Sequence, residues 1–299
     1  MKSWARVWRS AVCELGSAIR TRRALVVLVL YLAASLLTMY TSISILGKME
    51  TQLAETLQLP QDGKGKSGVV STALWKSRPF QRLVKAVVND DLVYNDVSGL
   101  HPAELIYACF AFFYVPLLTI LIGSNRVADD LHSGAVRYMI TRVTRFEWSL
   151  GKYVGNALLM LPAMLAGALA AWIVAAIRLS GADSFSLLPP MLVWAAKGWS
   201  LSLAYLGIAL GISHLTHSGA KATAFGVISL IVCFAVPKVL SHYFPAAAET
   251  LNLIFPATSE HSLWRASFKP VGCAVAWLLS LGLMYLTAGY AFFARRDAR

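Results

Sequence analysis

The stretch from Ala24 to Leu46, ALVVLVLYLAASLLTMYTSISIL, decides the fold because it contains no Asp, Glu, Lys or Arg. A bilayer core of about 30 Å needs roughly 20 apolar residues in a helix, and this run is long enough to span it. Charge-free runs of similar length follow at 105–123, 153–177 and 271–294. Two more apolar runs, at 191–213 and 222–240, each contain a single lysine. The pattern predicts an all-α integral membrane protein with six transmembrane helices.

The overall composition excludes an ordinary soluble domain and therefore a soluble enzyme. Of the 299 residues, 57% are hydrophobic and only 14% are charged, which indicates that the chain needs a lipid bilayer as its solvent. The formal charge of +12 does not indicate nucleic acid, because the basic residues form short clusters beside the apolar runs rather than one continuous polar face. Such clusters are typical of contact with anionic lipid headgroups.

The distribution of lysine and arginine predicts the orientation, since loops on the cytoplasmic side retain them. Basic residues gather in the first 23 residues, in the loop 124–152 and in the C-terminal tail. The segment 47–104 also has basic residues, but acidic residues dilute them. We therefore predict that both termini are cytoplasmic, that 47–104 is extracytoplasmic, and that the protein lies in a bacterial-type cytoplasmic (inner) membrane. Spans at 24–46, 105–123, 153–177, 191–213, 222–240 and 271–294 make up the domain 24–299.

Residues 1–23 form a separate element with its own periodicity. Its apolar residues recur at the three-to-four spacing of one helical face: Trp4, Val7, Trp8, Ala11, Val12, Leu15 and Ile19. Arg6, Arg9 and Glu14 lie off this face. The pattern predicts an amphipathic helix in the headgroup layer that precedes the first span. A cleaved signal sequence is disfavoured, because the following apolar run is span-length and no small-residue cleavage site follows it.

Residues that often carry chemistry show no catalytic arrangement here. Gly65-Lys66-Ser67 resembles the end of a phosphate-binding loop, but Pro60 stands where that motif needs glycine. The six histidines lack metal-ligand spacing, and no Ser, His and acid set falls on one face. We assign no catalytic residue, no metal and no cofactor to this chain. Its four cysteines are interpreted as small hydrophobes.

One charge lies well inside an expected span, and one small-residue pair lies beside it. Lys197 is a candidate pathway or interfacial residue, and its position near the outer end favours snorkelling of the ammonium to the interface. Gly207 and Gly211 have the GxxxG spacing, which favours close packing of helices.

The most informative stretch is the loop DDLHSGAVRYMITRVTR, residues 129–145, followed by Gly151-Lys152. It resembles the cytoplasmic loop of ABC-2 type permeases, where an acidic residue, a small turn, an aliphatic pair, Pro-Val-Ser-Arg and Gly-Lys follow one another. Asp130 stands at the acidic position, and Gly134 stands in the turn. Arg142 replaces the usual proline, and Ala135 replaces threonine. The amphipathic first helix, the six spans and the closing basic residues extend the resemblance over essentially the whole chain.

The resemblance implies a type V exporter-like fold and a specific assembly. It implies a dimer with a second copy or a homologous permease, and two separate ABC ATPase subunits that hold the ATP and Mg²⁺. In that family the loop transmits movement of the ATPases to the spans. The residues to which the resemblance gives an ATPase-coupling role are Asp129, Asp130, Gly134, Arg137, Met139, Arg142, Arg145 and Lys152.

A physical interpretation of the loop agrees with this role. The charged residues at its two ends and the apolar centre around Val136, Met139 and Ile140 would suit docking in a protein groove; a solvated positive-inside loop is the alternative. We expect Asp130 and Arg145 to contact the ATPase, and Lys152 to anchor the third span at the inner headgroups.

Several functions remain open at this stage. Export of an apolar or amphipathic substrate is the first, although the substrate itself cannot be read from the sequence. The second is transmission of ATP-driven movement to an extracytoplasmic partner protein, without cargo. An ion-coupled carrier is disfavoured because the spans lack acidic residues and histidines for an ion relay. A membrane-embedded enzyme is the least favoured, since the spans contain no polar cluster.

Overall fold

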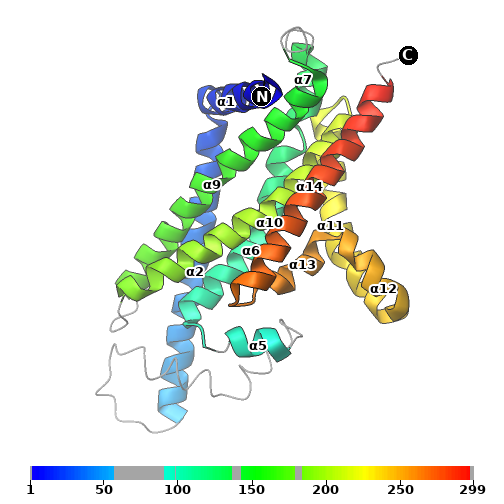
Figure 1. The fold of residues 1–299 in the computed structure, drawn as a ribbon. Coiled ribbons are helices and arrows are strands. Elements are labelled where there is room, and N and C mark those ends of the chain that lie inside the picture. Colours follow the sequence, from blue (N-terminus) through cyan, green and yellow to red (C-terminus); the bar gives the residue numbers. More distant parts are fainter. Residues whose placement is uncertain (1, 57–90, 98, 137–142, 179–183, 297–299) are drawn as a thin grey trace.

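The computed structural model describes residues 2–56, 91–97, 99–136, 143–178 and 184–296, and these residues form only helices, turns and loops. The α-helices are α1 (Lys2–Arg20), α2 (Arg23–Thr56), α5 (Asp91–Val97), α6 (Pro102–Gly123), α7 (Arg126–Ser133), α9 (Arg145–Arg178), α10 (Leu188–Leu215), α11 (Gly219–Tyr243), α12 (Pro245–Leu251), α13 (Pro256–Leu263) and α14 (Phe268–Arg296), with short 3₁₀ turns at Ser184–Leu187 and Asn252–Ile254 (Figure 1). The all-α class is confirmed.

Among the described residues, six segments are long and apolar enough to cross a membrane. They are Arg23–Ile45, Pro102–Ser133, Arg145–Arg178, Phe185–Leu215, Gly219–Tyr243 and Phe268–Arg295. Five of them contain an expected apolar run in full, and Arg23–Ile45 covers the run 24–46 except for its last residue. The structured helices extend beyond those runs because a helix does not end where its side chains become polar.

Helix α10 forms the centre of the bundle, in contact with α6, α9 and α14 (Figure 1). In the most apolar stretch of its span, 83% of the residues are buried. The corresponding buried fractions are 22% for the span of α2 and 17% for that of α11. The exposed faces of α2 and α11 carry large apolar side chains such as Leu37 and Ile231. This distribution is expected of a membrane protein, whose outer surface is as apolar as its interior.

Glycines bring α10 and α14 into backbone contact. A Cβ atom added to Gly207 would collide with the backbone of Gly282, and one added to Gly211 would lie 2.7 Å from the carbonyl oxygen of Tyr285. On α14, a Cβ added to Gly289 would collide with the backbone of Gly211. The expected close-packing role of the Gly207 and Gly211 pair therefore fits the observed geometry.

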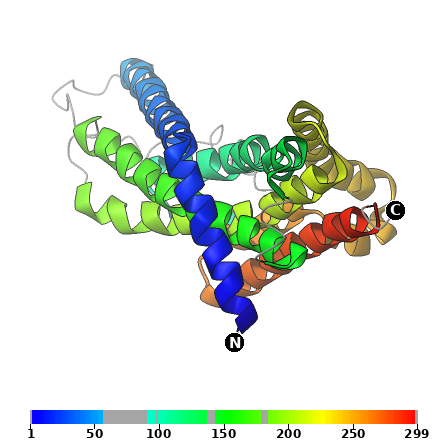
Figure 2. The same cartoon turned by 90° about the horizontal axis from the view of Figure 1, so that it is seen from above.

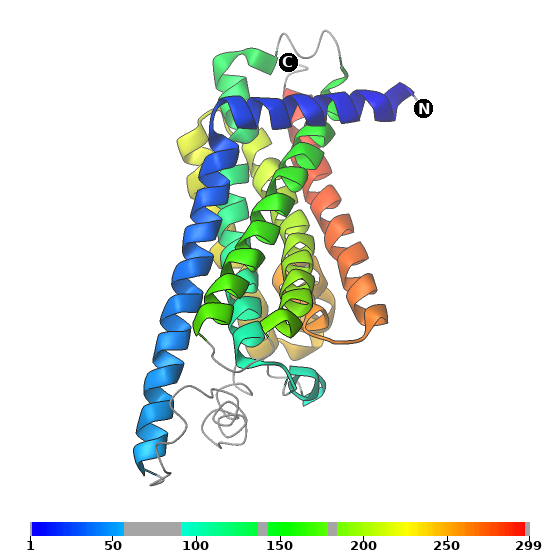
Figure 3. The same ribbon diagram turned by 90° about the vertical axis from the view of Figure 1, so that its left-hand side faces the viewer.

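Helix α1 lies across one end of the bundle, nearly perpendicular to the long helices (Figures 2 and 3). Both chain termini lie at this end, which we call the terminus end (Figure 1). The apolar face of α1 is divided between two environments. Val7 and Ala11 are buried, and α1 packs on α9, whereas Trp4 and Trp8 are exposed. A helix that packs on protein with one half of its apolar face and presents tryptophans on the other half suits the interfacial position predicted from sequence.

The opposite end of the bundle is formed by short helices. Helix α5 contributes Val93 and Val97 to the hydrophobic core. Asp96 accepts hydrogen bonds from Arg265 Nε at 2.9 Å and from the backbone N–H of Ala266 at 3.2 Å. These contacts attach α5 to the turn between α13 and α14.

Candidate coupling site and apolar cleft

Helix α7 positions the first part of the candidate coupling region. The backbone N–H groups of Val127 and Ala128 donate to Ser213 Oγ of α10 at 3.0 and 2.9 Å. This serine satisfies two of the free donors that every helix N-terminus leaves. The helix ends at Gly134, whose φ of 72° is in the left-handed region that glycine adopts without strain. The turn expected at Gly134 is therefore present.

Lys152 forms the centre of a buried ionic cluster. Its ammonium lies 2.9 Å from Glu14 Oε2 of α1 and 2.7 Å from Asp130 Oδ2 of α7, and its side chain is 4% exposed. Because a buried ammonium is costly unless it is paired, these two carboxylates explain how Lys152 is accommodated. The sequence predicts that Lys152 anchors the third span at the headgroups; in the folded chain α1 covers this part of α9, and the lysine pairs with anions inside the protein. Asp130 likewise makes its contact within the chain.

Glu14 was missed as a site residue by sequence reasoning. Burial raises the pKa of its carboxyl, but Lys152 together with Arg126 and Arg23 outweighs burial, so that the resulting pKa lies below its usual value. Glu14 lies off the apolar face of α1, and an acidic residue in that place normally faces water. Only the packing of α1 on α9 shows that it faces Lys152.

The neighbouring acidic residue, Asp129, lies against another helix, α11. A Cβ atom added to Gly219, the first residue of α11, would collide with the carboxylate of Asp129. A carboxylate next to the N-terminus of a helix is favoured by the helix dipole. The Asp129-Asp130 pair thus connects α7 to two different long helices, α11 and α9.

A second polar contact joins α1 to the start of α9. Glu147 accepts a hydrogen bond from Ser3 Oγ at 2.8 Å and lies 3.0 Å from Arg6. Glu147 Oε2 also accepts a hydrogen bond from the backbone N–H of Thr144 at 3.1 Å. In return, Thr144 Oγ1 accepts a hydrogen bond from the backbone N–H of Glu147. This is a capping box, and the Thr-x-x-Glu spacing is the sequence signal that could have identified it.

The remaining predicted coupling residues lie apart from this cluster or outside the described residues. The guanidinium of Arg145 lies 5.9 Å from the centre of the Phe293 ring at the end of α14. Arg137, Met139 and Arg142 fall in 137–142, outside the described residues. The described coupling residues, Asp129, Asp130, Gly134, Arg145 and Lys152, therefore all lie at the terminus end.

Lys197 is remote from them, near the turn between α13 and α14. Its ammonium donates to the carbonyl oxygen of Arg265 at 3.1 Å and lies 4.0 Å from the centre of the Trp194 ring. The ammonium of Lys197 therefore contacts protein groups near the start of α10. The sequence predicts that it reaches the membrane interface at this end.

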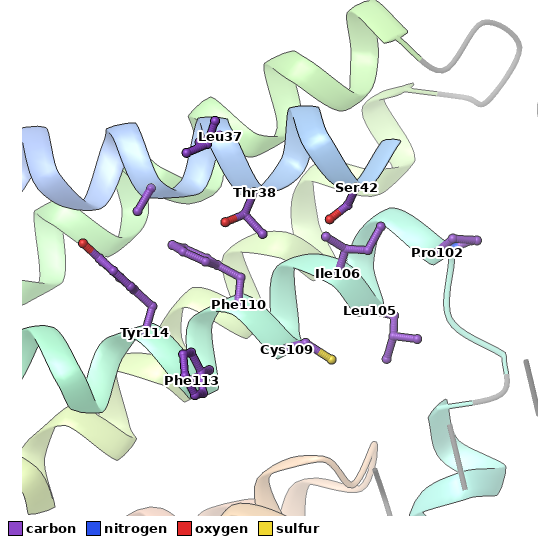
Figure 4. Close-up of a pocket in the computed structure, with 11 residues that line it drawn as sticks. Leu37, Thr38, Ser42, Pro102, Leu105, Ile106, Cys109, Phe110, Phe113 and Tyr114 are labelled. Carbon is purple, nitrogen blue, oxygen red and sulfur yellow. The ribbon is translucent and has the colours of Figure 1, made fainter. Parts of the chain in front are cut away.

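A cleft of about 550 Å³ lies between α2 and α6. Thr38 and Ser42 of α2 lie opposite Phe110 and Ile106 of α6 (Figure 4), and Leu37, Cys109 and Phe113 also line the cleft. The lining is mostly apolar, with hydroxyl groups from Thr38 and Ser42 on the α2 side. Such a cleft can accept an apolar group and offer a few hydrogen-bonding positions to a polar one. Among the described residues, no three His, Cys, Asp or Glu side chains form a group that could hold a metal ion.

The six candidate spans of the described residues define a multi-pass membrane protein. A family model described as "ABC-2 family transporter protein" matches residues 8–298. The chain therefore belongs to the ABC-2 family of transporter proteins, as the resemblance of the loop indicated. A search of curated proteins finds no match to the chain. Membership implies a transport-related membrane subunit that works with ABC ATPase components.

Proposed function

We propose that this chain is the permease subunit of an ATP-driven ABC exporter, coupled to separate ATPase subunits through the loop 129–145. The observation that carries the proposal is the attachment of α7, which leads directly into this loop. Ser213, Gly219 and Lys152 connect α7 to α10, α11 and α9 respectively. A movement of the loop is thereby delivered to three long helices at once, which is what conversion of ATPase closure into a rearrangement of the spans requires.

The class of substrate is proposed from the cleft between α2 and α6. Its aromatic and aliphatic lining, together with the hydroxyl groups of Thr38 and Ser42, favours an apolar or amphipathic molecule over a strongly charged one. The cleft lies between two candidate spans, so such a molecule would reach it sideways from the bilayer.

The proposed assembly contains two ABC ATPase subunits with bound ATP and Mg²⁺, and a second copy of this chain or a homologous permease. The ATPases would bind at the terminus end, which would be cytoplasmic in a bacterial inner membrane. Arg20, the last residue of α1, and Arg23, the first residue of α2, lie at this end and support that orientation. No role in binding nucleic acid is proposed.

The test is purification of the tagged chain from its native host in mild detergent, with crosslinking and mass spectrometry. We expect an ABC ATPase at one copy per copy of this chain. We also expect reconstituted proteoliposomes to transport an amphipathic dye in an ATP-dependent manner. If no ATPase is recovered after crosslinking, the proposal is wrong. The loop variant Arg145→Glu should weaken ATPase binding, while Lys197→Gln at the opposite end should not.

Transmission of movement to an outer partner protein is the second candidate function. Helix α5, at the end of the segment 47–104, is attached to the bundle by the ion pair of Asp96 with Arg265. This attachment favours the idea that movement of the spans reaches the outer segment. A stable outer partner, together with ATP turnover but no dye transport, would support it over export.

A further inference from the structure

The two walls of the apolar cleft continue into the two helices that Lys152 connects. Helix α2 follows α1 after a sharp corner at Arg22, whose φ is 58°. Helix α6 leads into α7 after only Ser124 and Asn125. Glu14 of α1 and Asp130 of α7 both bind the ammonium of Lys152. One lysine of α9 therefore joins the extensions of both cleft walls at the terminus end.

This junction does not depend on residues that are close in sequence. Glu14 precedes the first candidate span, Asp130 lies near the end of the second, and Lys152 belongs to the third. Both carboxylates are largely buried, with side-chain exposures of 13% and 27%. Without the lysine, two carboxylates would face one another with little water to screen them, which is unfavourable. The arrangement persists only while all three elements stay together.

Other contacts hold α1 more firmly to α9 than to α7. Gly151 is packed against Ser10, and Gly155 against the backbone of Ala11, on either side of Lys152. By contrast, α7 is joined to α1 and α9, within the described part of the chain, by the ion pair between Asp130 and Lys152. A displacement of α7 would therefore be passed to α1 and α9 through the lysine.

We propose that Lys152 is a positioning residue for coupling: by binding Glu14 and Asp130 together, it makes both walls of the cleft respond when the loop after α7 moves. This inference rests on the proposed function, because it takes the loop to be the element on which the ATPases act. Displacement of α7 acts on α6 directly and on α2 through Lys152, Glu14 and α1. Loss of the junction leaves α6 coupled and α2 uncoupled.

The test uses the native Cys109, which lines the cleft and is exposed. The other three cysteines, Cys13, Cys233 and Cys273, are replaced by alanine. The complex with its ATPase is reconstituted in nanodiscs, and the labelling rate of Cys109 by a membrane-permeant maleimide is compared between nucleotide-free and vanadate-trapped states. We expect the two rates to differ in the otherwise wild-type complex, because the cleft walls move.

The decisive variant is the neutral triple replacement of Glu14→Gln, Asp130→Asn and Lys152→Met. It removes the three charges of the junction together. The buried Arg126, which also interacts with Glu14 and Asp130, keeps Asp129 as its anion, so that folding should be maintained. ATPase binding and ATP hydrolysis are measured on the same complex. We expect the nucleotide-dependent difference in Cys109 labelling and the transport per ATP hydrolysed to fall about tenfold. The separate single variant Lys152→Arg keeps both ion pairs. Its nucleotide-dependent labelling difference and its transport per ATP should lie within about twofold of the wild-type values.

A milder variant covers the case in which the triple replacement does not fold. Glu14→Gln keeps the ion pair of Lys152 with Asp130 and breaks only the connection to α1, and it should lower the labelling difference in the same direction. If these variants keep the wild-type labelling difference and transport ratio, the role of Lys152 is overturned while the proposed function stands. If the wild-type complex lacks an ATPase altogether, both are overturned.

Discussion

Glycine residues decide how closely the central helix can approach α14. Gly207 and Gly282 contact each other through their backbones, and no side chain separates the two helices there. Such a contact gains dispersion energy along both helices, and it is lost when even a methyl group is inserted.

Gly207→Ala is therefore expected to destabilise the protein by about 1–3 kcal/mol, because the new methyl group would collide with the backbone of Gly282. Thermal unfolding in detergent, followed by a thiol-reactive dye at the buried Cys233, measures the effect. Gly272→Ala in α14 is the matched control, since a Cβ there meets no atom within 4 Å. Equal melting temperatures for the two variants would contradict the packing argument.

A single acidic residue of α13 is expected to make stability depend on pH. Burial raises the pKa of Glu260 to about 7, although the indole N–H of Trp264, at 3.4 Å, favours the charged form. The folded protein then binds this proton more tightly than the unfolded chain. The unfolding free energy is accordingly highest below the usual pKa of 4.5, falls as the pH rises towards 7, and levels above it.

Glu260→Gln should remove this dependence, because glutamine stays neutral. Relative to wild type, the variant is expected to gain about 1–3 kcal/mol between about pH 5 and about pH 8. Melting temperatures of both proteins across this range, in one detergent, measure the difference. Parallel profiles would show that Glu260 does not titrate in this range.

At the scale of elements, α5 shows how a short helix is held at the end of a membrane bundle. Seven residues cannot form a stable helix alone, so α5 depends on its buried valines and on Asp96. The carboxylate accepts hydrogen bonds from a side chain and from the backbone of the same turn, which fixes the direction of the helix as well as its position.

Asp96→Asn should loosen α5 without disturbing the long helices, because the amide loses the ion pair with Arg265. We expect a loss of about 0.5–1 kcal/mol, visible as faster hydrogen exchange in 91–97. Lys269→Gln, which removes an exposed charge at the start of α14, is the control. Unchanged exchange in Asp96→Asn would mean that the valines alone hold α5.

At the scale of the whole molecule, the described residues contain six candidate spans, and α1 lies at the same end of the bundle as the end of α14. The order of the spans then predicts which loops share a side of the membrane. The turn between α10 and α11, with the exposed His217, lies at the terminus end, whereas the segment 47–104 should lie on the other side.

This arrangement is tested with single cysteines at Ser17, Ser67 and His217 in a chain whose native cysteines are replaced. In intact cells, an impermeant maleimide should label Ser67→Cys, which lies outside the described residues, and should label the other two only after permeabilisation. Ser17→Cys on α1 serves as the internal reference for His217→Cys. Labelling of Ser67→Cys and His217→Cys from the same side would contradict the predicted topology.

The sequence by itself determined the fold class, the amphipathic first helix and the family. A span depends on the composition of one continuous run, such as Ala24 to Leu46, and the family is indicated by a local pattern in the loop. Amphipathic periodicity also predicted α1, because side chains on one face of a helix are set by their spacing. These features need no knowledge of which helix packs on which.

Only the tertiary structure decided which residues of the site meet. Sequence reasoning put Glu14 off the apolar face of α1 and Lys152 at the headgroups, and it gave Asp130 to the ATPase. In the folded chain α1 lies over the start of α9, and the three charges form one buried cluster. Contacts between residues more than a hundred positions apart depend on how whole helices cross, and no local spacing encodes that crossing.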